Sequence, residues 1–134
     1  MRIEHVGLWV RDLDGVAAFY SRYFGGGVGG VYENPRKGCR SRFLTLGEGA
    51  RLELMMRTDV TEPATDCSLG LAHVAIVVGD AAAVDVFAAR LRADCHDILD
   101  GPRRTGDGYY ECVVRDPEGN RVEIAAEAAR REFR

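Results

Sequence analysis

The first residues of the chain alternate strictly between two kinds of side chain. In segment 3–10, apolar residues fall on one face of a predicted strand, while His5 and Trp9 fall on the other. Asp12 then follows as a candidate helix N-cap. Apolar residues recur at helical spacing from there to the glycines at 25–27, which predict the end of the helix.

Shorter alternating segments follow this helix. Residues 28–33, 41–46 and 50–57 read as strands, separated by turns that are rich in glycine, asparagine and proline. The first module therefore spans 1–57. Segment 58–70, which contains Pro63, Ser68 and several Thr and Asp residues, reads as a linker.

The chain then repeats itself. Segment 71–78, LAHVAIVV, aligns with segment 3–10, IEHVGLWV, by a shift of 68 residues that places His73 on His5 and Asp80 on Asp12. With a shift of 70, RLEL at 51–54 returns as RVEI at 121–124. The second module thus spans 71–126, with a helix after Asp80, a weak strand near Ile98 and strands at 109–114 and 121–126. A charged tail occupies 127–134.

Each module has the order βαβββ, and a single module of this kind cannot bury both faces of its sheet. The two modules are therefore expected to pack together, either within one chain or between two chains. The predicted fold class is α+β, with two βαβββ modules forming curved mixed sheets around a cavity and related by a pseudo-twofold axis. On each sheet one face is apolar and suited to its helix, and the other mixes polar and apolar residues, as a ligand-binding cavity requires.

Strand alternation places two histidines and two glutamates on these mixed faces: His5, Glu53, His73 and Glu123. Two neutral imidazoles and two carboxylates suit a divalent ion such as Zn, Ni, Co, Mn or Fe. A single strand histidine is more often structural, and a single strand glutamate is usually solvated. The metal hypothesis therefore rests on the recurrence of one His and one Glu at equivalent places in a duplicated unit.

Composition narrows the range of functions. Apolar residues make up 46% of the chain and charged residues 29%, as in an ordinary soluble globular protein, and the net charge of −3 gives no basis for nucleic-acid binding. The chain has no long apolar run for a membrane span and no signal-peptide pattern. Four cysteines without a CxxC motif favour reduced thiols, each a small buried hydrophobe, in a cytoplasmic protein.

The repeat, its His and Glu positions and the DPEGNRVEI ending resemble the vicinal oxygen chelate superfamily of glyoxalase, bleomycin resistance and dioxygenase proteins. The resemblance extends from Ile3 to about Ala126 and is strongest for short glyoxalase I-like proteins. It is carried by YENPRKG at 32–38, GARLELM at 49–55 and RTGDGYYECVVRDPEGNRVEI at 104–124. It implies the fold described above, a bound divalent metal ion (Ni, Zn, Co or Mn) and a small-molecule substrate.

The resemblance also implies a chemistry. Fosfomycin-resistance proteins and extradiol dioxygenases use two His and one Glu, which correspond here to His5, His73 and Glu123. The additional acidic residue Glu53 is what glyoxalase I has at that place. The chain is thus expected to be a metal-dependent isomerase or lyase in which Glu123 moves a carbon-bound proton and Glu53 is its symmetric counterpart. Alternatives are an epimerase, an epoxide-opening transferase and a resistance module that only binds a small molecule.

The substrate is less defined. Glyoxalase I relatives hold glutathione with an Arg and an Asn, whose places correspond here to Trp9 and Arg57, so the use of glutathione as a co-substrate stays open. Phe43 and Tyr109 are further candidates for the substrate-binding face. The resemblance implies a homodimer with sites shared between subunits, while closure within one chain is the alternative.

Overall fold

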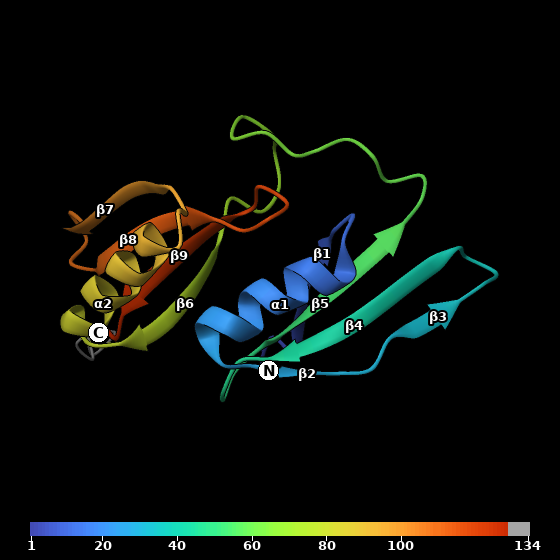
Figure 1. The fold of residues 1–134 in the computed structure, drawn as a ribbon, viewed down its shortest axis with the longest axis horizontal. Coiled ribbons are helices and arrows are strands. Elements are labelled where there is room, and N and C mark those ends of the chain that lie inside the picture. The colour runs from blue at the N-terminus through green and yellow to red at the C-terminus, as the bar shows by residue number, and fades with distance from the viewer. Residues whose placement is uncertain (129–134) are drawn as a thin grey trace. The chain divides into compact units, whose positions relative to one another are not determined.

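The computed structural model describes residues 1–128, and these form two compact units in sequence (Figure 1). The first unit is Met1–Pro63 and the second begins at Ala64. The predicted tail 127–134 lies outside the described residues from position 129 onward.

The first unit contains one helix and one mixed sheet. Its elements are, in order, β1 His5–Trp9, α1 Leu13–Phe24, β2 Gly27–Val28, β3 Tyr32–Asn34, β4 Cys39–Thr45 and β5 Arg51–Arg57. The strand order is β1-β5-β4-β2, and β3 pairs with β4 off this path. β1 runs parallel to β5, and the other pairings are antiparallel.

Helix α1 begins and ends where the sequence predicts. The Asp12 side chain accepts a hydrogen bond from the Gly15 N–H at 2.9 Å, which satisfies a donor of the first turn. Gly25 closes the helix in the left-handed region, with φ of +69°. The apolar stripe of α1, centred on the fully buried Val16 and Tyr20, packs against the sheet face that carries Leu44, Leu52 and Leu54. Alternate residues of β5 therefore face away from the helix.

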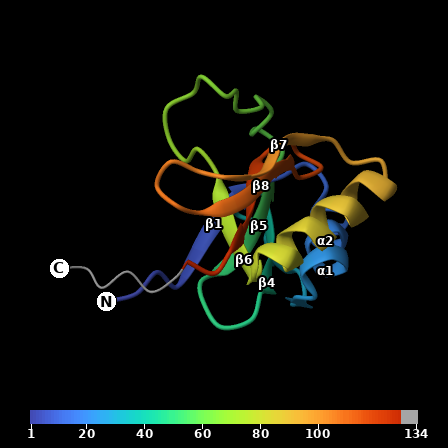
Figure 2. The same ribbon diagram turned by 90° about the vertical axis from the view of Figure 1, so that its left-hand side faces the viewer.

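The second unit repeats this plan. Its elements are β6 Val74–Gly79, α2 Ala81–Ala93, β7 Ile98–Arg104, β8 Tyr110–Arg115 and β9 Arg121–Ala126. The strand order is β6-β9-β8-β7, with β6 parallel to β9. Figure 2, in which this unit faces the viewer, shows α2 along one face of the sheet. The prediction of an α+β fold with two βαβββ modules is therefore confirmed.

Helix α2 begins as α1 does, at an aspartate N-cap. The Asp80 side chain accepts from the Ala83 N–H at 2.9 Å and caps the first turn. Val84, Ala88 and Leu91 are fully buried, as are the facing strand residues Val114, Val122 and Ile124. A polar link adds to this apolar contact, because the Tyr110 hydroxyl donates to the Asp85 carboxylate at 2.7 Å.

The DPEGN segment forms the tight turn between β8 and β9. Asp116 is only 4% exposed, and its carboxylate accepts from the N–H groups of Glu118 and Asn120, both at 2.9 Å, and from Asn120 Nδ2 at 3.0 Å. Gly119 has φ of +88°, which a residue with a β-carbon adopts only with strain. The turn therefore sets the register in which β9 pairs with β8.

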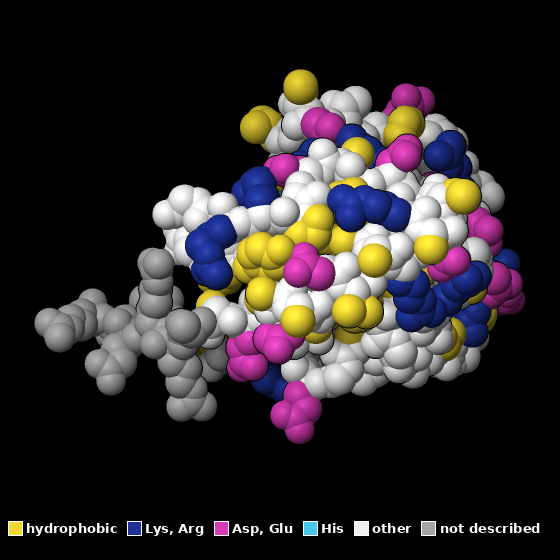
Figure 3. Space-filling model, turned by 60° about the vertical axis from the view of Figure 1, so that its left-hand side comes forward, with side chains coloured by type: hydrophobic (Ala, Val, Ile, Leu, Met, Phe, Trp, Pro, Cys, Tyr) yellow, Lys and Arg dark blue, Asp and Glu magenta, His cyan; other side chains and the backbone are white. Residues whose placement is uncertain are grey.

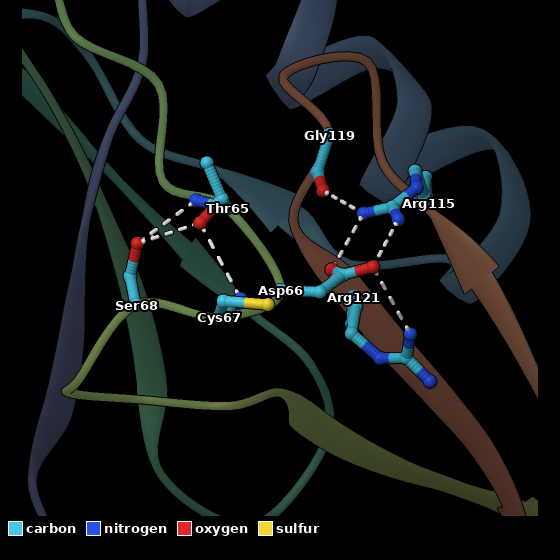
Figure 4. A network of polar contacts seen from close by, with 7 residues as sticks. All are labelled: Thr65, Asp66, Cys67, Ser68, Arg115, Gly119 and Arg121. Atoms are coloured by element: carbon cyan, nitrogen blue, oxygen red, sulfur yellow. Dashed lines mark hydrogen bonds and ion pairs between the residues drawn. The ribbon is translucent and has the colours of Figure 1, made fainter.

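Part of the predicted linker is bound to the second unit (Figure 4). The Asp66 carboxylate accepts from both terminal nitrogens of Arg115, at 2.8 and 3.3 Å, and lies 3.7 Å from Arg121 Nη1. Arg115 also donates to the Gly119 carbonyl at 2.9 Å. A turn in which the Ser68 N–H donates to the Thr65 carbonyl at 3.0 Å holds the segment together.

Several sequence predictions need correction. The strand predicted at 28–33 forms only the short β2 and β3, because Gly29 and Gly30 interrupt it. The strand predicted at 71–78 begins at Val74, so His73 lies one residue before β6.

The weak strand near Ile98 is the full strand β7, whose register with β8 shifts twice. The prediction that all the cysteines are buried is also wrong, since only Cys112 is buried and both Cys67 and Cys95 are exposed.

Candidate functional site

In the first unit, His5 and Glu53 meet on the sheet face turned away from α1. Their strands are parallel neighbours, with Gly7 of β1 beside Glu53 of β5. Gly7 lies between His5 and the end of β1 on the same sheet face and has no side chain, so nothing on β1 keeps the His5 imidazole away from the Glu53 carboxylate. His5 Nε2 lies 3.5 Å from Glu53 Oε2, and the imidazole is 42% exposed while the carboxylate is 18% exposed. The pair is therefore accessible from one side and partly shielded from solvent.

His5 is held from its other side by a second carboxylate. Glu4 contacts His5 Nδ1 through one carboxylate oxygen and the Arg51 guanidinium through the other. The hydrogen bonds from His5 and Arg51 lower the pKa of Glu4. Phe43 of β4 completes the surroundings, with its ring perpendicular to the imidazole at a centroid distance of 5.4 Å.

The second unit brings its own His–Glu pair together. His73 Nδ1 lies 3.2 Å from Glu123 Oε1, although His73 precedes its strand. Glu123 is paired in register with Ala75 of β6, and its carboxylate is 19% exposed. The two units therefore present the same pair of residue types, but His5 turns Nε2 toward its glutamate and His73 turns Nδ1.

The donor set fits a divalent cation. A neutral imidazole offers one nitrogen lone pair, and a carboxylate offers acceptor oxygens only. In each pair these groups face one another, so a proton or a metal ion between them would remove the repulsion of two acceptors. Among residues 1–128 no three His, Cys, Asp or Glu side chains are arranged so that they could hold a metal ion together, and each unit by itself brings together two of the four predicted ligands.

Three of the predicted substrate contacts lie in the first unit. The Arg57 guanidinium lies 5.1 Å from the centre of the Trp9 ring and pairs with Asp59, and Trp9 is 43% exposed. Phe43 lies beside the His–Glu pair, as described above. Tyr109, in the second unit, precedes β8 in the turn, where its N–H donates to Thr105 Oγ1 at 2.9 Å and its side chain is exposed.

The sequence analysis missed Glu111. Strand alternation places it on the face of β8 that continues that of Glu123, since Val113 pairs with Glu123 and Glu111 with Ala125. Glu111 is buried, and burial, followed by the charge of Glu123, raises its pKa. Arg103, its register partner on β7, opposes this effect. The alternation of residues along β8 could have placed Glu111 on the same sheet face as Glu123. It was passed over because a single glutamate in a strand is usually exposed to solvent.

Figure 3 shows which types of side chain lie on one face of the molecule. In the view of Figure 3, basic, acidic and hydrophobic side chains are interspersed, with no extended field of one charge. No helix within residues 1–128 is both long enough and apolar enough to cross a bilayer.

Comparison with known proteins places the chain in a family. The profile of the Glyoxalase/Bleomycin resistance protein/Dioxygenase superfamily matches residues 2–124. Uncharacterized protein PA2024 of Pseudomonas aeruginosa is 30% identical over 126 residues, which cover 92% of this chain and 86% of that protein.

Two solved structures share both fold and sequence with the chain. The trypanothione-dependent glyoxalase I of Leishmania major is 28% identical, with a TM-score of 0.76, covering 95% of this chain and 87% of that one. The lactoylglutathione lyase of Agrobacterium tumefaciens is 26% identical, with a TM-score of 0.68, covering 93% and 92%. The duplicated module, the paired His and Glu residues and a profile match over nearly the whole sequence agree, and the chain belongs to the glyoxalase/bleomycin resistance protein/dioxygenase superfamily.

Proposed function

We propose that the chain is a metal-dependent isomerase or lyase of the glyoxalase type. The substrate would be a small molecule with vicinal oxygens, such as a hydroxy-carbonyl compound or a hemithioacetal. The observation that carries the proposal is the His–Glu pair found in both units, at 3.5 Å in the first and 3.2 Å in the second. The likeness to glyoxalase I of L. major and to the A. tumefaciens lyase supports it.

The metal would be held by His5, Glu53, His73 and Glu123. Two nitrogen and two carboxylate donors suit Ni, Zn, Co or Mn and leave coordination positions for substrate oxygens. When bound, the ion supplies Lewis-acid polarisation of those oxygens, which makes the neighbouring carbon-bound proton more acidic.

The proton is moved by a glutamate. Glu123 takes it from one carbon and returns it to the adjacent carbon, and Glu53 is its counterpart in the first unit. Both carboxylates are more than four-fifths shielded from solvent, which limits exchange of the proton with water. His73, 3.2 Å from Glu123, orients that carboxylate.

Substrate binding falls to Trp9, Arg57, Phe43 and Tyr109. Trp9 offers an aromatic wall, and Arg57 above it offers a cation whose partner, Asp59, a substrate carboxylate could replace. This arrangement would accept any substrate that carries a carboxylate. Glutathione is therefore one candidate co-substrate, and other thiols with a carboxylate are further candidates.

We further propose a homodimer in which the first unit of one chain and the second unit of its partner form each site. A His5→Ala chain mixed with a His73→Ala chain would then regain one intact site per heterodimer. Recovered metal binding in the mixture is the expected result. No recovery would show that each site closes within one chain.

The proposed function is tested by metal content and turnover. Protein purified without added metal is analysed for bound metal, loaded with each divalent ion and assayed on the glutathione–methylglyoxal hemithioacetal. His5→Gln is expected to reduce both metal affinity and turnover, while His96→Gln, a histidine outside the repeat, serves as the matched control. Bound metal without turnover would exclude this substrate, and no binding of any divalent ion would refute the enzyme proposal.

A further inference from the structure

Glu4 connects two side chains at the edge of the first unit's candidate site. Its Oε2 contacts His5 Nδ1, and its Oε1 accepts from Arg51 Nε at 2.9 Å and also from Arg51 Nη2. The backbone reinforces this position, because the Arg51 N–H donates to the Glu4 carbonyl at 3.0 Å. Glu4 is thus joined to β5 through both its backbone and its side chain.

The ring that Glu4 contacts is confined on a further side. Phe43 stands perpendicular to the His5 imidazole at 5.4 Å, and the Arg51 guanidinium lies 4.1 Å from the centre of the same phenyl ring. The four residues therefore form a ring of contacts: His5 contacts Glu4, Glu4 contacts Arg51, Arg51 lies over Phe43, and Phe43 lies beside His5. Such a set restricts rotation of the imidazole and selects which nitrogen faces Glu53.

The second unit differs at this point. The repeat that aligns His5 with His73 places Ala72, which has no carboxylate, at the position of Glu4. Arg121, which corresponds to Arg51, lies 3.7 Å from Asp66 of the linker segment instead. The carboxylate that precedes the histidine is therefore particular to the first unit.

This contact decides the chemistry of His5. A neutral imidazole carries its proton on one nitrogen and a lone pair on the other, and the partner of the first determines the choice. A carboxylate accepts only, so Glu4 requires the proton on Nδ1. Nε2 is then left as a lone-pair donor, facing Glu53 Oε2 at 3.5 Å. A nitrogen lone pair and a carboxylate oxygen in this arrangement form two ligands for one cation.

We propose that Glu4 is a positioning residue that holds His5 in its Nδ1–H form and thereby presents Nε2 to a divalent metal ion shared with Glu53. The metal itself belongs to the proposed function, on which this part of the inference rests. The tautomer does not depend on the metal, because Glu4 contacts His5 Nδ1 directly and is itself held by Arg51 within the first unit. Partners of this kind behind a metal-binding histidine raise metal affinity about 10- to 100-fold.

The test uses Glu4→Ala and Glu4→Gln, with Glu33→Gln as the matched control. Glu33 is an exposed glutamate of the same unit that pairs with Arg40 instead of a histidine. The first measurement is nitrogen-detected NMR of the histidine rings in the metal-free protein, recorded at a pH at which the nitrogen shifts show each ring to be neutral. In the parent and in Glu33→Gln we expect His5 to carry its proton on Nδ1. In Glu4→Ala we expect the signal of His5 to move toward the Nε2–H form, with His73 and His96 unchanged.

The second measurement is the dissociation constant for Zn²⁺, obtained by competition with a chelator. Glu4→Ala is expected to weaken binding about 10- to 100-fold. Glu4→Gln is expected to retain the Nδ1–H tautomer, since its amide oxygen still accepts, and to weaken binding less. This partial rescue would separate positioning of the ring from a general loss of structure.

The outcomes are distinct for the two proposals. An unchanged His5 tautomer in Glu4→Ala, or an affinity loss no larger than that of Glu33→Gln, would overturn the role of Glu4. If the parent protein binds no Zn²⁺, the proposed function fails, while the tautomer measurement on the metal-free protein still decides whether Glu4 positions His5.

Discussion

The Asp116 carboxylate is the feature on which the β8–β9 turn most depends. Replacing it by alanine removes three hydrogen bonds, those from the Glu118 and Asn120 N–H groups and from the Asn120 side chain. The two backbone donors would then have to be satisfied by water in a turn whose first residue is 4% exposed. We therefore expect Asp116→Ala to destabilise the protein well beyond an ordinary surface substitution.

The magnitude follows from the contacts. Hydrogen bonds to a charged group contribute about 1.5–3 kcal/mol each, and neutral ones about 1 kcal/mol. Water can reach Glu118 and Asn120, which are only partly buried, so we take the lower values and expect a loss of about 2–4 kcal/mol. Asp116→Asn keeps one acceptor oxygen and should lose about half as much.

Urea unfolding followed by circular dichroism measures this loss as a shift in midpoint at constant slope. Asp100→Asn is the control, because Asp100 lies in the same unit and pairs with Arg103 near the surface, where solvent screening leaves an ion pair with little effect on stability. Hydrogen exchange at the Glu118 and Asn120 amides should also accelerate in Asp116→Ala. If Asp116→Ala is no less stable than Asp100→Asn, the carboxylate does not hold the turn and the reasoning is refuted.

Three further predictions concern stability. Burial raises the pKa of Glu111 in the folded state, so the protonated carboxyl binds its proton more tightly there than in the unfolded chain. The resulting contribution to folding stability is present at low pH and is lost as the pH rises through the folded-state pKa. Glu111→Gln should therefore raise Tm by about 2–4 °C at neutral pH and by much less at about pH 4, measured by thermal unfolding at both. Leu54→Ala removes a fully buried side chain and should cost about 2–5 kcal/mol in urea unfolding. Asp66→Ala breaks the exposed contacts with Arg115 and Arg121, so it should leave the urea midpoint nearly unchanged but speed proteolytic cleavage of segment 64–69.

Each of these predictions has a contrary result. A Glu111→Gln protein that gains nothing at neutral pH, or gains equally at both pH values, would mean that the carboxyl is not held in a raised-pKa environment. A loss below about 1 kcal/mol for Leu54→Ala would place that side chain outside the packed core. Unchanged cleavage of segment 64–69 in Asp66→Ala would show that other contacts hold it.

Much of the fold could be predicted because its signals are local. Both helices begin after Asp12 and Asp80, the residues that the sequence identifies as N-caps, because a carboxylate can accept from the first-turn N–H groups wherever it occurs. Strand β9 was predicted with its observed bounds, since the DPEGN turn before it and the alternation within it are both strong. The internal repeat added the information that the two modules share one plan.

The errors fall where tertiary context decides. The strand predicted at 28–33 breaks at glycines, which take whatever conformation their neighbours require. His73 lies outside β6 because the pairing of β6 with β9 begins only at Val74, and no local residue type marks that point. Cys67 and Cys95 are exposed because burial of a small side chain depends on what packs over it, which its own identity does not reveal.

The sequence by itself determined the duplicated βαβββ plan, the position of both helices and the candidacy of His5, Glu53, His73 and Glu123. These follow from periodicity and capping, which act over a few residues, and from the repeat. Only the tertiary structure revealed that Glu4 contacts His5, that Asp66 contacts Arg115 and that Glu111 is buried beside Glu123 on the sheet. Those relations join residues through strand pairing and packing, and their energies depend on burial and distance, quantities that exist only once the chain has folded.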